Sequence, residues 1–291
     1  GTQPPATYVA GSIMPAVSVA VLDAWGSTTS EPATVNVQVS NSGTLTGAVF
    51  AVSNSSAIAS FTNLSSTVSA SATADTSLVF TVDGVAGSEL QSNLFQVTPA
   101  AAYSFRFADQ GDVATSAESG IRIRSQAGGD ILLEVLDEYG NLVVDDNTTR
   151  LTASTSNTIT SMNGKTARAV NGVVSFSALT LNAAAGSGYS ISFTAANAGT
   201  SVNGKSIQSS TFTLLAGTAA QLDLVTTSDT VRSGITFGQL PAIQILDAEG
   251  SLITSGPNST LSAAVEVRHV TGGSGALPSL SGTIAISASA G

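Results

Sequence analysis

The sequence predicts an all-β chain, arranged as an elongated array of tandem β-sandwich domains. One segment occurs three times, as Val19–Gly26, Leu133–Gly140 and Ile243–Gly250. The aspartates of this segment, Asp23, Asp137 and Asp247, lie roughly 110 residues apart, which is the size of a small domain. No stretch shows the 3.6-residue period of an amphipathic helix. A repeated, strand-rich unit is therefore expected.

Further landmarks keep the same spacing and set the boundaries. Phe61, Phe176 and Ile286 each follow their aspartate by roughly 40 residues. We place three domains at residues 1–99, 100–217 and 218–291, called the first, second and third repeat below. The spacing leaves no room for a full first strand in the first repeat, and the third lacks its C-terminal half. We expect flanking residues of a longer chain to complete both repeats; strand donation by a neighbouring copy is the alternative.

Short runs of alternating apolar and polar residues separate clusters of Gly, Asn, Asp and Ser. This alternation predicts antiparallel strands with one buried face. The clearest predicted strands are Thr34–Val39, Ile121–Ile123, Thr149–Ala153, Val173–Phe176 and Tyr189–Phe193. About seven short strands per hundred residues is typical of an immunoglobulin-like sandwich.

Three local signals concern turns. Asn163-Gly164 and Asn203-Gly204 predict tight hairpins, because Asn and Gly tolerate the positive φ of primed turns. The single tryptophan, Trp25, shares its repeat position with Tyr139 and Glu249. A position that accepts tryptophan, tyrosine and glutamate is expected at a turn and not in the core.

Composition excludes several classes of partner. The 291 residues carry a net charge of −10, which disfavours binding to nucleic acid and to anionic membranes. Apolar residues make up 42% of the chain but aromatic residues only 5%, so the cores must be built mainly from aliphatic side chains. There is no cysteine, so neither a disulfide nor a thiolate metal site can form. No apolar run of this sequence is long enough to span a bilayer.

The repeated strand ending Leu-Asp-x-x-Gly is followed in the second repeat by a polar strand, Thr149–Thr155, and by the run Asn171–Phe176. A closing strand around Phe212 then leads through Ala216–Ala219 into the third repeat. This pattern resembles the tandem bacterial Ig-like repeats of large surface proteins, of the invasin and intimin type, and filamin-like repeats share much of it. The resemblance covers all of the second repeat and parts of the others, and it implies a stalk or spacer on a cell surface or secreted filament.

The repeated aspartates Asp23, Asp137 and Asp247 are the natural candidates for a metal site. A carboxylate at the end of a sandwich could ligate calcium between domains. The alternative is that each aspartate accepts backbone N–H groups in the turn leading to the following glycine. Calcium needs several converging oxygens, and no Asp-x-Asp-x-Asp-Gly loop occurs. We favour the turn and expect no bound metal or cofactor; the acidic stretches Asp109–Asp112 and Asp145–Asn147 are expected to be solvated loops.

No residue pattern predicts catalysis. His269 is the only histidine and is expected to be an ordinary strand residue. Lys165 and Lys205, the only lysines, are expected at poorly buried hairpin tips, where an isopeptide cross-link would not form. Four asparagines fit the N-glycosylation pattern, which matters only in a glycosylating secretory pathway: Asn54, Asn63, Asn147 and Asn258.

These observations predict a non-enzymatic structural protein of the cell surface or extracellular space, acting as a stalk, spacer, or filament or sheath component. Its expected partners are neighbouring repeats of the same chain and copies of itself in a filament or layer. The alternative is an adhesin-type binding module that recognises a glycan or receptor through an exposed face or loops. The scarcity of aromatic residues argues against a sugar-stacking surface.

Overall fold

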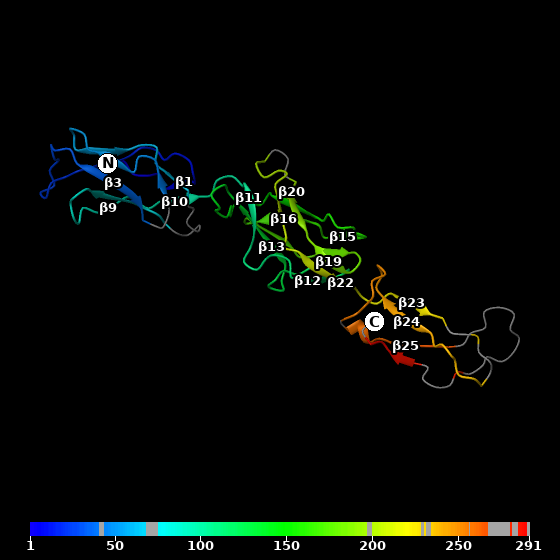
Figure 1. The fold of residues 1–291 in the computed structure, drawn as a ribbon. Helices are drawn as coiled ribbons and strands as arrows, with labels where there is room; N and C mark the ends of the chain where they lie inside the picture. Colours follow the sequence, from blue (N-terminus) through cyan, green and yellow to red (C-terminus); the bar gives the residue numbers. More distant parts are fainter. Residues whose placement is uncertain are drawn as a thin grey trace.

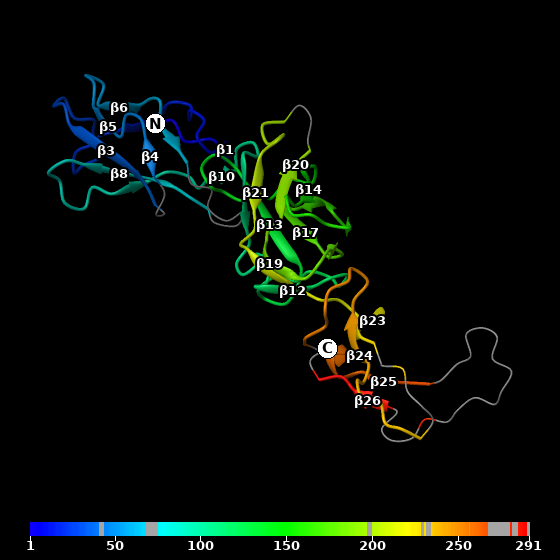
Figure 2. The same ribbon diagram turned by 45° about the vertical axis from the view of Figure 1, so that its right-hand side comes forward.

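The computed structural model is built from β-strands, as the sequence predicts. It describes residues 1–40, 44–67, 75–196, 200–227, 230, 234–255, 257–266, 280 and 285–289. Within these ranges the one helical element is the short 3-10 turn η1 (Pro257–Thr260). Figures 1 and 2 show three successive groups of strands along an elongated molecule, formed by residues 7–98, 104–215 and 221–287.

The first group packs small sheets around one apolar core. Its strands are β1 (Thr7–Val9), β2 (Val17–Ala20), β3 (Thr34–Val39), β4 (Leu45–Thr46), β5 (Phe50–Val52), β6 (Ile58–Phe61), β7 (Ser65–Ser66), β8 (Leu78–Val82), β9 (Leu90–Gln91) and β10 (Gln96–Thr98). The largest sheet has the order β5-β3-β8-β9, and β2 pairs with β6. Phe61 of β6 and Phe80 of β8 meet in the core, with ring centroids 5.4 Å apart.

The second group is the most extensively paired. Its strands are β11 (Ser104–Phe107), β12 (Ser116–Glu118), β13 (Ile131–Leu136), β14 (Arg150–Ser154), β15 (Ser161–Asn163), β16 (Thr166–Val170), β17 (Val173–Phe176), β18 (Thr180–Asn182), β19 (Gly186–Tyr189), β20 (Ser192–Ala195), β21 (Ser206–Gln208) and β22 (Phe212–Leu215). Seven of them run in the order β11-β13-β17-β16-β14-β20-β21. The halves of this sheet are joined by β16, which pairs with β14 at one end and β17 at the other. The rings of Phe176 and Phe193 pack between the two halves of the sheet, with their centroids 4.8 Å apart.

The third group contributes β23 (Gln221–Thr226), β24 (Ala242–Leu246), β25 (Ser262–Ala264) and β26 (Ala285–Ser287), which pair as β23-β24 and β25-β26. Of the apolar side chains that the structure describes here, Ile245 and Ile253 are buried. Several others are exposed on the described strands and loops, including Leu222, Ile235 and Ile286.

The first and second groups share a strand arrangement. The strand preceding the repeated aspartate pairs antiparallel with the strand ending in the repeated phenylalanine, as β2 with β6 and β13 with β17. An early short strand pairs parallel with the last strand of its group, as β1 with β10 and β12 with β22. The sequence repeat therefore corresponds to a repeat of strand pairing.

Two predicted strands are wrong in detail. Ile121–Ile123 forms no strand, because only Arg122 makes an isolated bridge, to Thr180. The run Tyr189–Phe193 is divided: β19 ends at Tyr189 opposite Phe212, whereas β20 begins at Ser192 in a different sheet. An alternating pattern does not reveal the point at which a chain passes from one sheet to another.

The predicted Asn-Gly hairpins are also corrected. Asn163-Gly164 joins β15 to β16, which lie in different sheets, and Asn203-Gly204 lies within a longer connection between β20 and β21. The tight hairpin is at Asn171-Gly172, with φ values of 50° and 77° and with Val170 opposite Val173. Only at this pair do two mutually paired strands end on both sides of the Asn-Gly dipeptide, the condition for a two-residue primed turn.

A buried carboxylate supports that hairpin, contrary to the expectation of a solvated loop at Asp145–Asn147. Asp146 is buried, and its side chain accepts hydrogen bonds from the amides and hydroxyls of Thr148 and Thr149. The Asp146 carbonyl accepts the Gly172 amide at 2.9 Å. Burial tends to raise the pKa of Asp146, but the threonine hydrogen bonds outweigh it and hold the pKa below its usual value.

Substitution of Gly172 by alanine should destabilise the second repeat by roughly 2–3 kcal/mol, because φ is positive and the new Cβ would lie 2.5 Å from the Val143 carbonyl oxygen. The matched control is Gly128→Ala, where φ is also positive (80°) but the space is open, so about 1–2 kcal/mol is expected. Urea unfolding measures both. Equal losses of unfolding free energy in the two variants would contradict a clash between the new side chain at position 172 and the Val143 carbonyl oxygen.

Acid should weaken the second repeat through Asp146. Because its folded-state pKa is lowered, the stabilisation is present above the unfolded-state pKa of about 3.9 and is lost as the pH falls through the folded-state pKa. Urea unfolding between neutral pH and about pH 2 should therefore show a smaller decrease in stability for Asp146→Asn than for the unmodified chain. The same acid dependence in both proteins would show that Asp146 contributes nothing to it.

Candidate functional site: the junctions between repeats

The repeated aspartates form three equivalent turns. We call Asp23–Ser27, Asp137–Asn141 and Asp247–Ser251 the Asp turns. In each, carboxylate Oδ1 accepts the backbone amides two and four positions later, at distances between 2.7 and 3.0 Å. The glycine three positions after the aspartate has φ between 79° and 85°, a left-handed conformation that favours glycine. The structure thus places all three aspartates in the turn that the Asp-x-x-Gly pattern predicts.

The second carboxylate oxygen distinguishes the turns. Oδ2 of Asp137 accepts the Ala100 amide, and Oδ2 of Asp247 accepts the Gly217 amide, both at 2.9 Å. Ala100 and Gly217 are each the second residue after the last strand of the preceding group, β10 or β22. Each of these aspartates therefore holds its own turn with one oxygen and the incoming linker with the other.

The two aspartates that bind a linker are also the two that are buried. Asp137 and Asp247 are 1% and 0% exposed. Asp23 is exposed, and among the described residues its carboxylate is bonded through Oδ1 alone. Charge-assisted bonds from several N–H groups are what make a buried carboxylate tolerable. The linker amides are therefore among the donors that stabilise the buried carboxylates of Asp137 and Asp247.

At the first junction, the Asp turn at 137–141 lies against the end of the first group. The Tyr139 ring covers Gly11, so closely that a Cβ on Gly11 would lie 1.9 Å from the Tyr139 hydroxyl oxygen. Nδ2 of Asn141 donates to the Thr67 carbonyl at 2.9 Å and to Oδ2 of Asp137 at 2.8 Å. A hydrogen bond with Glu138 raises the pKa of Tyr139 above its ordinary value, and desolvation and nearby negative charge add to the effect.

At the second junction the same turn positions make the contacts. Oε2 of Glu249, equivalent to Tyr139, lies 3.4 Å from Oγ of Ser119. Oγ of Ser251, equivalent to Asn141, accepts the Ala185 amide at 2.8 Å. Gly217 of the linker lies against Ser119, since a Cβ there would be 2.5 Å from the Ser119 carbonyl oxygen. Both junctions thus join an Asp turn to the end of the preceding group through matching positions.

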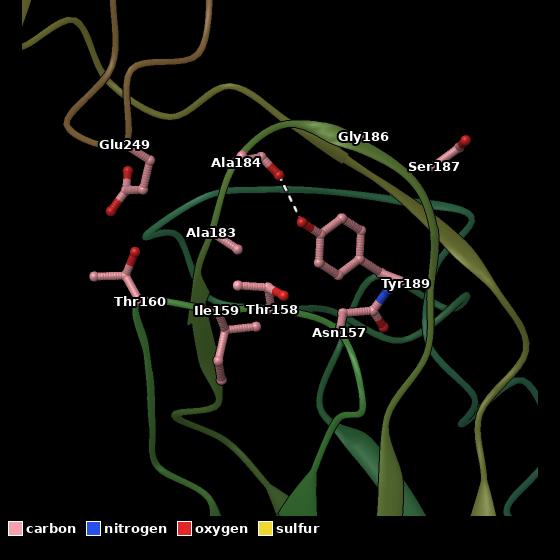
Figure 3. Close-up of a pocket in the computed structure, with 10 residues that line it drawn as sticks. All are labelled: Asn157, Thr158, Ile159, Thr160, Ala183, Ala184, Gly186, Ser187, Tyr189 and Glu249. Carbon is pink, nitrogen blue, oxygen red and sulfur yellow. Dashed lines mark hydrogen bonds between the residues drawn. The ribbon is translucent and has the colours of Figure 1, made fainter.

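A hollow of about 420 Å³ opens beside this second junction. Figure 3 shows Tyr189 and Glu249 on opposite sides of it, with the Tyr189 hydroxyl donating to the Ala184 carbonyl. Its other lining residues are Ile159 and small or polar residues such as Asn157, Thr158 and Ser187. None of its lining side chains is a histidine, cysteine or lysine.

The carboxylates of Asp137 and Asp247 are occupied by N–H donors, which a cation would have to displace. Among the residues that the structure describes, no three histidine, cysteine, aspartate or glutamate side chains gather as a metal site would require. The expectation of no bound calcium stays a prediction for the chain as a whole.

The remaining sequence candidates lie apart from the junctions. Lys165 is exposed, whereas the Lys205 ammonium lies 3.3 Å from the centre of the Tyr103 ring, a cation–π contact that the sequence did not predict. His269 lies outside the described residues. The potential glycosylation sites are exposed at Asn54, Asn63 and Asn147 and half-buried at Asn258.

Sequence reasoning identified the aspartates but missed the residues that the aspartates and their turns contact. Ala100 and Gly217 are visible in retrospect, because each stands two residues after a closing strand. Gly11 and Gly120 also recur in phase, each just after the short strand that pairs parallel with the last strand. Thr67 and Ala185 carry no signal, because they contribute backbone groups that any residue could supply.

No family model matches the chain, and no curated protein matches it. Among solved structures, it is similar to the adhesin InvE of Yersinia pseudotuberculosis, with 17% identity and a TM-score of 0.31 over 79% of this chain and 64% of that chain. It is also similar to domains 4–9 of the surface layer protein SbsC, with 17% identity and a TM-score of 0.22 over 75% and 31%. The chain spans less than two thirds of either structure, and similarity this low carries no argument about function.

In the part of the chain that is described, no helix has the length and hydrophobicity needed to cross a bilayer.

Replacement of Asp137 by asparagine should destabilise the second repeat by about 2–4 kcal/mol, because an amide nitrogen at the Oδ2 position would face the Ala100 and Asn141 donors. The matched control is Asp23→Asn, which retains the Oδ1 acceptor of an exposed turn and should cost less than about 1 kcal/mol. Urea unfolding would measure both. Similar losses at the two positions would show that the linker bond contributes little.

Proposed function

We propose that the chain is a non-enzymatic spacer of an extracellular or cell-surface protein, which keeps whatever it carries at a set distance and direction. The observation that carries this proposal is the repeated junction, in which one buried aspartate binds both its own turn and the linker from the preceding repeat. The composition, poor in charge and rich in small polar residues, suits a stalk or a filament or sheath component.

The geometry supports a spacer because each junction is held at several separate points. At the first junction these points are the Ala100 amide in the linker, Gly11 beneath the Tyr139 ring, and the Thr67 carbonyl bound by Asn141. A linker alone leaves neighbouring domains free to rotate. Contacts on both sides of the linker oppose bending and twisting, so the length of the row is maintained.

The resemblance of the sequence to bacterial Ig-like surface repeats supports the same function, and so does the absence of a recognisable catalytic pattern. Under this proposal the domains correspond to residues 1–99, 100–217 and 218–291, each joined to the next through an Asp turn. The partners of each repeat are then the adjacent repeats of its own chain.

The spacer proposal is tested by measuring how sharply the distance between two repeats is defined. The chain has no cysteine, so Thr62→Cys and Ser177→Cys would place one spin label on each of the first two repeats at equivalent exposed positions. Electron–electron double resonance should give a narrow distance distribution in the otherwise unmodified chain. A broad distribution would contradict the proposal.

The same labelled pair tests the role of the junction. Asp137→Ala should broaden the distribution, because it removes both acceptors at once. Asp23→Ala, in the turn that holds no linker among the described residues, should leave the distribution unchanged. Broadening by both variants would indicate general loosening of the domains.

A further inference from the structure

The first two groups build the same four-stranded surface along their sides. The order β5-β3-β8-β9 in the first group corresponds to β16-β14-β20-β21 in the second. Thr34 of β3 lies opposite Val52 of β5, and Arg150 of β14 lies opposite Arg168 of β16. Thr34 therefore corresponds to Arg150, and Val52 corresponds to Arg168.

A backbone hydrogen bond supports this register. Asp83, the residue directly after β8, donates its amide to the Thr34 carbonyl at 2.9 Å. Ala196, the residue directly after β20, donates its amide to the Arg150 carbonyl at 3.0 Å. Asp83 and Ala196 are thus equivalent as well, so the chemistry of the two surfaces can be compared position by position.

In the first group this surface combines exposed apolar side chains with a carboxylate. We call Phe50, Val52 and Asp83 the Phe50 face. Phe50 and Val52 are 61% and 57% exposed and alternate along β5 with the less exposed Ala51, so both point to solvent. Asp83 is exposed beside them, across Thr34. Large apolar side chains gathered on one exposed face indicate an interaction surface.

In the second group the equivalent surface is basic. We call Arg150, Arg168 and Val170 the Arg168 face. Both arginines are exposed, and Val170, two residues after Arg168 on the same side of β16, is 65% exposed. Like charges directly opposite each other destabilise an antiparallel strand pair. A carboxylate brought to this face from outside would relieve the repulsion between the two guanidinium groups.

The charges of the whole repeats follow the same division. Residues 1–99 contain five acidic residues and neither lysine nor arginine, whereas residues 100–217 contain seven of the nine basic residues. Within one chain the two faces do not meet, because their groups follow one another along an elongated molecule (Figures 1 and 2). A second copy of the chain offers each face the opposite charge.

We propose that the Phe50 face of one copy docks side by side onto the Arg168 face of a second copy. Asp83 pairs with the guanidinium of Arg168, a charge-assisted contact. The exposed ring of Phe50 offers its face to the other guanidinium, that of Arg150, in a cation–π contact. Val52 and Val170 supply apolar area beside these contacts.

This contact goes beyond the proposed spacer function, because it joins two chains laterally and needs no fixed angle between the repeats of one chain. It differs from strand donation, since each copy keeps its own sheets. If copies fail to associate, the narrow distance distribution between the first and second repeats is unaffected. If the spacer proposal fails, that distribution is broad whether or not copies associate.

Sedimentation equilibrium of the full chain tests the contact. The unmodified chain should associate with a dissociation constant between about 1 μM and 1 mM. Arg168→Asp should weaken association at least tenfold, because it places a carboxylate against Asp83. The matched control is Arg124→Asp, which changes the net charge equally at an exposed residue outside the face and should leave association unchanged. Equal weakening by both variants, each shown to be folded by circular dichroism, would overturn the proposal.

A mixing experiment tests which faces meet. Asp83→Arg should also weaken association at least tenfold, because it places a cation against Arg168. An equimolar mixture of Asp83→Arg and Arg168→Asp should associate again, since the first variant keeps its Arg168 face and the second keeps its Phe50 face. A contact between two like faces would be weakened by only one of the two variants. That result, or a mixture that stays monomeric, would overturn the proposal.

The apolar part of the contact is tested separately. Phe50→Ser should weaken association at least tenfold, because it removes the exposed ring and leaves every charge in place. The matched control is Leu94→Ser, at a residue 58% exposed in the same repeat but outside the face, which should have no effect. Equal effects of the two variants, or an unmodified chain that stays monomeric up to about 1 mM, would overturn the proposal.

Discussion

The structure depends on one interaction, the acceptance of backbone N–H groups by the carboxylate of the repeated aspartate. A carboxylate offers two oxygens with about four lone pairs, so it can serve two segments of chain at once. Asp137 uses one oxygen for the amides of its own turn and the other for the linker and for Asn141. Asp247 repeats the division with Gly217 as the linker residue.

This arrangement explains why a charged residue can lie fully buried at each junction. A buried carboxylate without partners is costly, whereas one surrounded by N–H donors is stabilised by them. The turn supplies two donors wherever the Asp-x-x-Gly segment occurs, including at Asp23. At Asp137 and Asp247 the linker supplies a further donor, and both aspartates are buried; Asp23, to which the described residues give no linker donor, is exposed.

The domain cores and the junctions obey different chemical requirements. The cores of the first two groups are large aliphatic and phenylalanine clusters, in which residue volume matters most. The junctions use a tyrosine over a glycine, an amide on a carbonyl, and hydroxyl contacts at Ser119 and Ser251. Polar contacts of this kind bury little apolar area but define direction, as the proposed spacer function would require of the junctions.

The sequence by itself determined the all-β class, the period of the repeat, most of the longer strands and the turn around each aspartate. These are local properties: strand alternation depends on neighbouring side chains, and an Asp-x-x-Gly turn closes within five residues. The sequence also placed Trp25 at a turn, from the three different residues that share its position.

Tertiary structure decided the remainder. It divided the run Tyr189–Phe193 between two sheets, made Asn171-Gly172 the tight hairpin in place of the other Asn-Gly pairs, and buried Asp146 beneath that hairpin. It also decided which aspartates hold a linker, because their donors come from residues roughly 30 to 40 positions earlier in the chain. Contacts of that separation depend on how the ends of two sandwiches meet, and the residues that supply backbone groups there leave no mark in the sequence.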